Sequence, residues 1–136
     1  METQAPLLAS QIAVQVCLFL VAAICLLGGA LQMYLGEPEV SPRLDNVHRF
    51  LAGVYLGSGF ISLWAGATIA RQGTLVLLVA FCVFLAGMGR LVSIYKVGMP
   101  QPRAVWIGYL VPELLLPWII LIAQTMTNEK LGWSWN

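Results

Sequence analysis

The chain alternates between long apolar stretches and short polar breaks. The apolar stretches predict four helices, over about residues 7–35, 46–70, 74–96 and 103–127. Each is as long as the roughly 20 residues that a membrane-spanning helix needs. The breaks contain Gly, Pro and charged residues, which end helices. The pattern therefore predicts an all-α membrane protein with a single four-helix transmembrane domain over residues 1–136.

Composition supports this prediction. Hydrophobic residues make up 60% of the chain and charged residues 10%, whereas a soluble domain carries about a quarter charged residues. Because the connections are short, consecutive helices are predicted to be antiparallel neighbours in an up-down-up-down bundle. Both chain ends then lie on one face of the membrane and the Pro-containing loops on the other. The formal net charge of +1 gives no argument for nucleic acid binding.

Two ionisable residues lie deep inside the apolar stretches. At a rise of about 1.5 Å per residue, Arg90 lies about 9 Å from the end of the third helix, and Glu113 about 15 Å from the start of the fourth. A charge at such depth costs about 2.5–3.5 kcal/mol on insertion scales. We therefore predict a direct salt bridge between these residues. The sequence leaves open whether the pair only joins two helices or also forms a ligand or proton site.

Further polar residues are predicted to lie near the same pair, on the side of the Pro-containing loops. Together they predict a vestibule that holds an amphipathic molecule such as a lipid, with its acidic or polar head near two arginines. The opposite half of the bundle is expected to hold few polar groups. The candidate ligand-binding residues are Arg49, Arg90, Glu113, Ser93, His48 and Tyr55.

The second helix carries closely spaced small residues. Gly53 and Gly57 form a GxxxG face, and Gly59 begins a second small-residue face. Such faces allow helix backbones to approach closely. One face is expected to meet a neighbour within the bundle and the other a second protomer, which predicts a homo-oligomer or a larger membrane complex. Asp45 or Asn46 is expected to cap the start of this helix.

Motifs for known chemistry are absent from the sequence. There is no Ser-His-Asp, Cys-His or nucleotide-loop arrangement, so whether the protein is an enzyme stays open. His48 is the only histidine, which excludes bis-histidine haem within one chain, and no carboxylate–histidine cluster indicates a metal. We expect no cofactor and no metal site. Cys17, Cys25 and Cys82 lie in apolar stretches and are expected to be buried thiols.

Several of these residues also carry a family resemblance. Residues 49–59 read RFLAGVYLGSG, residues 89–93 read GRLVS, residues 98–100 read GMP and residues 113–116 read ELLL. This order resembles the small bacterial membrane family catalogued as domain of unknown function 4345, over about residues 7–124. The resemblance implies four helices and a multi-pass protein of the bacterial inner membrane. It implies no activity.

The sequence is compatible with more than one class of function. The first interpretation is an accessory or assembly component whose polar intramembrane site binds a lipid or another amphipathic small molecule. The alternative is a small-molecule transporter or a membrane enzyme that uses the Arg90–Glu113 pair. Small multidrug-type transporters are of similar size, but their essential glutamate lies in the first helix, whereas Glu113 lies in the fourth predicted helix.

Overall fold

The computed structural model describes residues 6–132. Within these residues, each of the long helices is long and apolar enough to cross a membrane. The predicted all-α membrane class is therefore confirmed. The elements in chain order are α1 (Ala9–Leu35), α2 (Pro42–Ala67), the short 3-10 helix η1 (Ile69–Arg71), α3 (Thr74–Val97) and α4 (Arg103–Leu131).

The start of α2 differs from the prediction. Ser41 is the N-cap, and its hydroxyl oxygen accepts a hydrogen bond from the backbone N–H of Leu44 at 3.1 Å. Pro42 takes the first helical position, where a backbone N–H is not needed. Asp45 and Asn46 therefore lie inside the helix, and the N-cap expected at these residues is wrong.

Helix α4 is continuous through two internal prolines, Pro112 and Pro117. It extends to Leu131, beyond the predicted end near residue 127. Gly132 ends it in a left-handed conformation with φ of 65°, which glycine adopts without the steric penalty of a side chain. The long helix carries polar residues of its last turns back toward the start of α1.

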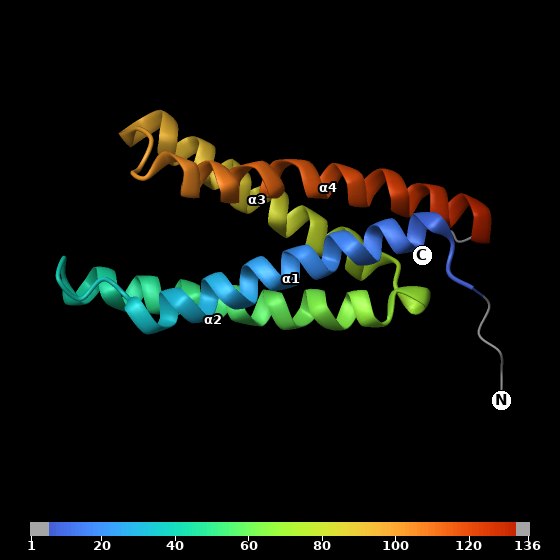
Figure 1. Cartoon of the computed structure of the whole chain (residues 1–136), viewed down its shortest axis with the longest axis horizontal. Helices are drawn as coiled ribbons and strands as arrows, with labels where there is room; N and C mark the ends of the chain where they lie inside the picture. The colour runs from blue at the N-terminus through green and yellow to red at the C-terminus, as the bar shows by residue number, and fades with distance from the viewer. Residues whose placement is uncertain (1–5, 133–136) are drawn as a thin grey trace.

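Two helical hairpins make up the bundle (Figure 1). α1 packs most extensively on α2, and α3 on α4, while α1 also contacts α4. α2 and α3 touch along a short stretch only. The start of α1, the end of α4 and the α2–α3 connection lie at one end, the terminal end, and connections 36–41 and 98–102 lie at the opposite, loop end. This agrees with the predicted up-down-up-down arrangement, although the hairpins spread apart toward the loop end (Figure 1).

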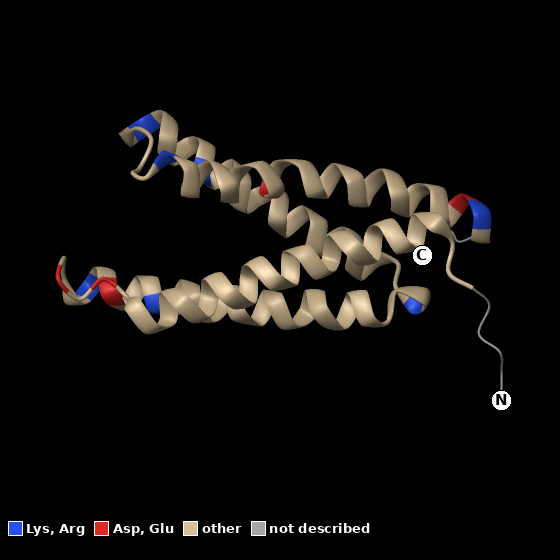
Figure 2. Ribbon diagram, in the orientation of Figure 1, with Lys and Arg blue, Asp and Glu red and all other residues tan. Residues whose placement is uncertain are grey.

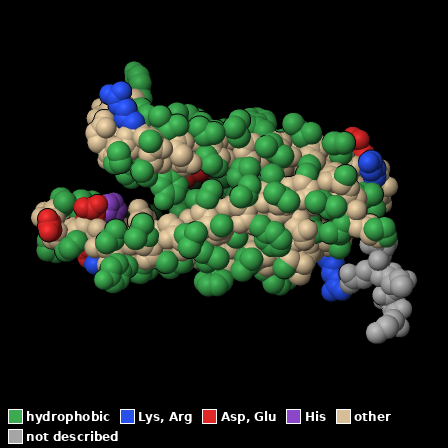
Figure 3. Space-filling view, in the orientation of Figure 1, with side chains coloured by type: hydrophobic (Ala, Val, Ile, Leu, Met, Phe, Trp, Pro, Cys, Tyr) green, Lys and Arg blue, Asp and Glu red, His purple; other side chains and the backbone are tan. Residues whose placement is uncertain are grey.

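The buried core lies where the two hairpins meet. Val14 and Leu18 of α1, Val76 of α3 and Ile120 of α4 are all 0% exposed. Charged residues gather mainly at the two ends of the bundle (Figure 2), and apolar side chains cover much of the flank (Figure 3). This distribution is typical of helices that face lipid along most of their length.

Small residues of α2 differ in what they contact. A Cβ at Gly59 would lie 2.8 Å from Leu26 Cγ of α1, and nearby Ser62 is 1% exposed. This side of α2 therefore packs within the hairpin. A Cβ at Gly53 would make an ordinary contact with one methionine side chain at 3.6 Å, and a Cβ at Gly57 would have nothing within 4 Å. Gly57 is thus on an open surface of the chain.

Candidate functional site

Arg90 and Glu113 meet between α3 and α4. Arg90 Nε donates a hydrogen bond to Glu113 Oε2 at 2.6 Å. The close approach depends on Gly87, where an added Cβ would lie 3.2 Å from Glu113 Cβ. The Glu113 side chain is 6% exposed and that of Arg90 28%. The predicted direct contact between the two charges is confirmed.

Aromatic side chains complete the surroundings of this ion pair. Tyr55 of α2 donates its hydroxyl hydrogen to Glu113 Oε1 at 3.3 Å, so both carboxylate oxygens have a donor. The guanidinium carbon of Arg90 lies 5.7 Å from the ring centroid of Trp106 and 5.2 Å from that of Tyr109. Both are cation–π distances. The pair is thus held by α3 and α4 and is connected to the other hairpin through Tyr55.

A vestibule opens beside the pair at the loop end. It has a volume of about 590 Å³ and corresponds to the hollow between the two hairpins in Figure 3. Small-molecule sites typically measure about 300–1,000 Å³ and combine apolar walls with a few polar groups. Its polar and aromatic lining residues are Gln32, Glu37, His48, Tyr55, Arg90, Trp106 and Tyr109.

A second cavity lies along the gap between α2 and α3. We call it the lateral groove; its volume is about 440 Å³, and residues such as Ile61 and Val79 give it a mainly apolar lining. Val54 and Tyr55 line both this groove and the vestibule. The two cavities therefore adjoin at these residues: a chamber with several polar groups in its lining, at the loop end, borders a mainly apolar groove.

Arg49 is not among the residues that line the vestibule, contrary to the prediction. Its Nε donates to Asp45 Oδ2 at 2.9 Å, and its Nη1 donates to the carbonyl of Met33 near the end of α1. Asp45 Oδ1 also accepts from the backbone N–H of Glu37 at 2.8 Å. Arg49 therefore holds the α1–α2 connection in place, and the role of a second ligand-binding arginine is not supported.

Of the two remaining candidate ligand-binding residues, His48 and Ser93, only His48 lines the vestibule. Nδ1 of His48 lies 3.7 Å from Glu37 Oε1. Ser93 is exposed on α3 and is not part of the vestibule lining.

The cysteines differ in burial. Cys25 is buried beside Tyr55, as expected. Cys82 is exposed, so the prediction that it is buried is wrong.

A second group of buried polar residues lies at the terminal end, where few were expected. Ser10 Oγ and Thr127 Oγ1 are 2.7 Å apart and connect α1 to α4. Gln124 Nε2 donates to Asn128 Oδ1 at 3.0 Å, and all four residues are at most 7% exposed. Since these hydrogen bonds are satisfied internally, we interpret the cluster as a polar contact that closes this end of the bundle.

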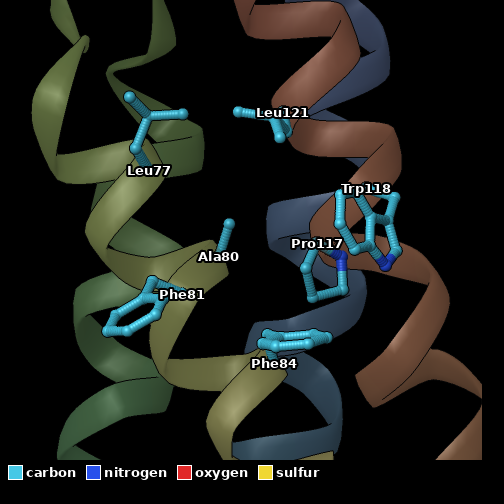
Figure 4. A pocket seen from close by; sticks show the side chains of 7 residues that line it. All are labelled: Leu77, Ala80, Phe81, Phe84, Pro117, Trp118 and Leu121. Carbon is cyan, nitrogen blue, oxygen red and sulfur yellow. The ribbon is translucent and has the colours of Figure 1, made fainter.

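A third cavity is an almost entirely apolar groove on α3 and α4 (Figure 4). Its volume is about 300 Å³. Phe84 and Trp118 meet edge to face there, with their ring centroids 5.9 Å apart. The lining residues shown in Figure 4 are apolar apart from the indole nitrogen of Trp118, so this groove has few of the polar groups that orient a bound molecule. The vestibule with its lateral groove is therefore the stronger candidate site.

Within residues 6–132, no group of three or more His, Cys, Asp or Glu side chains is placed to hold a metal ion.

Comparison with known proteins gives one match. Neither the curated proteins nor the solved structures contain a match to the chain. The family described as Domain of unknown function (DUF4345) matches residues 13–124, which include the Arg90–Glu113 pair and the whole vestibule lining. The chain therefore belongs to the DUF4345 family.

Proposed function

We propose that this protein binds an amphipathic molecule inside the membrane. The polar head occupies the vestibule and the apolar tail occupies the lateral groove between α2 and α3. The observation that carries the proposal is that Val54 and Tyr55 line both cavities. A head-and-tail molecule matches a cavity with several polar groups beside a mainly apolar groove, whereas a fully polar solute would leave the groove without a role.

The head is expected to supply most of the selectivity. A tail that moves from lipid into an apolar groove gains little, because lipid chains are as apolar as the groove. In contrast, Arg90 has five N–H donors, of which Nε is taken by Glu113. The other N–H groups, together with Gln32 and His48 of the vestibule lining, are available to hydrogen-bond a polar head.

The alternative functions are less well supported by the geometry. A transporter or acid–base enzyme that uses the Arg90–Glu113 pair needs this carboxylate to exchange protons or substrates with its surroundings. Glu113 instead accepts hydrogen bonds from Arg90 and Tyr55 and is 4% exposed. A role as an accessory or assembly component stays a prediction, to which the open surface at Gly57 is relevant. The bacterial inner membrane also stays the predicted location.

The proposal is tested by filling the vestibule. A Cβ at Gly28 of α1 would lie 3.4 Å from Tyr55 Cε1 and 3.6 Å from the Tyr109 hydroxyl oxygen, both ordinary contacts. Gly28→Leu should therefore fold, while the rest of the leucine side chain occupies space needed by the head. Gly89→Leu is the matched control, because a Cβ there would have nothing within 4 Å.

Native mass spectrometry measures the outcome. The purified protein is offered three single-chain probes with an 18-carbon monounsaturated chain, namely 1-oleoylglycerol, 1-oleoylglycerol 3-phosphate and oleylamine. We expect at least one probe to be retained at one equivalent, with binding weakened about tenfold or more in Gly28→Leu and unchanged in Gly89→Leu. Retention of no probe, or equal weakening in both variants, would overturn the proposal.

A further inference from the structure

We infer that the head of the bound molecule carries no net charge and presents hydroxyl or carbonyl oxygens. This inference rests on the proposed function and goes beyond it by naming the chemical class of the ligand: an uncharged, hydrogen-bonding head on a single apolar chain. It replaces the acidic head that two free arginines would favour. The contacts of each charged group near the vestibule carry the inference.

The ionisable residues of the vestibule lining have partners within the protein. Arg90 is bonded to Glu113 at 2.6 Å, and Glu37 lies 3.7 Å from His48, an ion pair only when the imidazole is protonated. Arg49, the expected second cation, is bonded to Asp45 at 2.9 Å and is not part of the lining. The pair and the lining thus hold two carboxylates against one arginine and one histidine, which leaves no excess of positive charge for an anion.

A charged head of either sign meets a competitor already in place. An anionic head would compete with the buried carboxylate of Glu113 for Arg90 and would lie near Glu37. A cationic head would compete with Arg90 itself, whose guanidinium already lies against Trp106 and Tyr109. An uncharged hydroxyl or carbonyl oxygen accepts from the remaining N–H groups of Arg90 without breaking the ion pair.

The three probes separate these cases, because they share the chain and differ in the head. At pH 7.5 the heads of 1-oleoylglycerol, 1-oleoylglycerol 3-phosphate and oleylamine are uncharged, anionic and cationic. We expect 1-oleoylglycerol to bind the wild-type protein about tenfold more tightly than either charged probe. Equal or tighter binding of a charged probe that Gly28→Leu abolishes would overturn this inference while leaving the proposed function intact.

A charge-removing variant tests the reason for the preference. Glu37 lines the vestibule and its side chain is 45% exposed, whereas Glu39 is exposed in the same loop and is not part of the lining. Glu37→Gln should strengthen binding of 1-oleoylglycerol 3-phosphate about threefold, a modest change because solvent screens an exposed charge. The quantity compared is the affinity for 1-oleoylglycerol 3-phosphate divided by that for 1-oleoylglycerol, which should rise about threefold in Glu37→Gln.

The matched control, Glu39→Gln, removes the same charge from the loop without touching the vestibule. It should change neither affinity. If Glu37→Gln and Glu39→Gln have the same effect on the phosphate probe, the vestibule carboxylate does not set the preference and the inference fails. The affinity for 1-oleoylglycerol is measured for both variants, so that a general loss of binding is separated from a change in charge preference.

Discussion

Replacing Arg90 should destabilise the protein far more than replacing the whole ion pair. Arg90→Met keeps an unbranched side chain as far as the position of Nε, but it removes the guanidinium group, including the Nε donor that lies 2.6 Å from Glu113. The Glu113 side chain, 6% exposed, then keeps Tyr55 at 3.3 Å as a donor. Stranding one partner of a buried pair costs about 3–5 kcal/mol. The double variant Arg90→Met, Glu113→Leu should cost about 1 kcal/mol or less.

The free energy of unfolding in detergent is followed by circular dichroism. It is measured for the wild type, Arg90→Met, Glu113→Leu and the double variant, which form a double-mutant cycle. Arg103→Met is the matched control, since Arg103 is exposed at the start of α4, and such surface changes stay within about 0.5 kcal/mol. If the double variant loses as much stability as Arg90→Met, or if Arg90→Met costs no more than the control, the two charges do not support each other as the structure indicates.

The remaining predictions concern helix packing and the terminal end. Gly59→Leu should destabilise the fold by about 1–3 kcal/mol, because its Cβ would lie 2.8 Å from a leucine side chain of α1. Gly57→Leu, with nothing within 4 Å, should leave the melting temperature unchanged and reduce oligomers in chemical crosslinking; a lower melting temperature would contradict its open position. Thr127→Val breaks the 2.7 Å contact to Ser10 and should lower the free energy of unfolding by about 1 kcal/mol. The control Thr125→Val should lower it less, and an equal loss in both variants would count against the polar contact.

Part of this site could be predicted from residue depth alone. Arg90 and Glu113 are charged residues about 9 and 15 Å deep, an offset that an arginine side chain can span, on helices joined by a short loop. Burying either alone is costly, so the sequence predicts that they pair. The sequence wrongly places Arg49 in the vestibule, because the predicted start of the second helix is residue 46. With the true start at Pro42, Asp45 and Arg49 stand four residues apart on one helix, the spacing of a local ion pair.

Other features depend on how the hairpins sit in space. The vestibule and the lateral groove exist because α2 and α3 touch along a short stretch only, and no periodicity in the sequence reports such a gap. Gln124, Thr127 and Asn128 share one face of α4 at helical spacing, but their position near the helix end was equally compatible with an interfacial location. Their burial depends on the start of α1 covering that face.

Photo-crosslinking with a 1-oleoylglycerol probe that carries a diazirine in the middle of its chain tests the central claim most directly. Bound as proposed, the probe should label peptides from residues 54–62 of α2 and 75–86 of α3, which contain most of the lateral groove lining, and an excess of unlabelled 1-oleoylglycerol should suppress that labelling. Even labelling of all four helices, or labelling centred on Trp118 in the apolar groove of α3 and α4 (Figure 4), would contradict it.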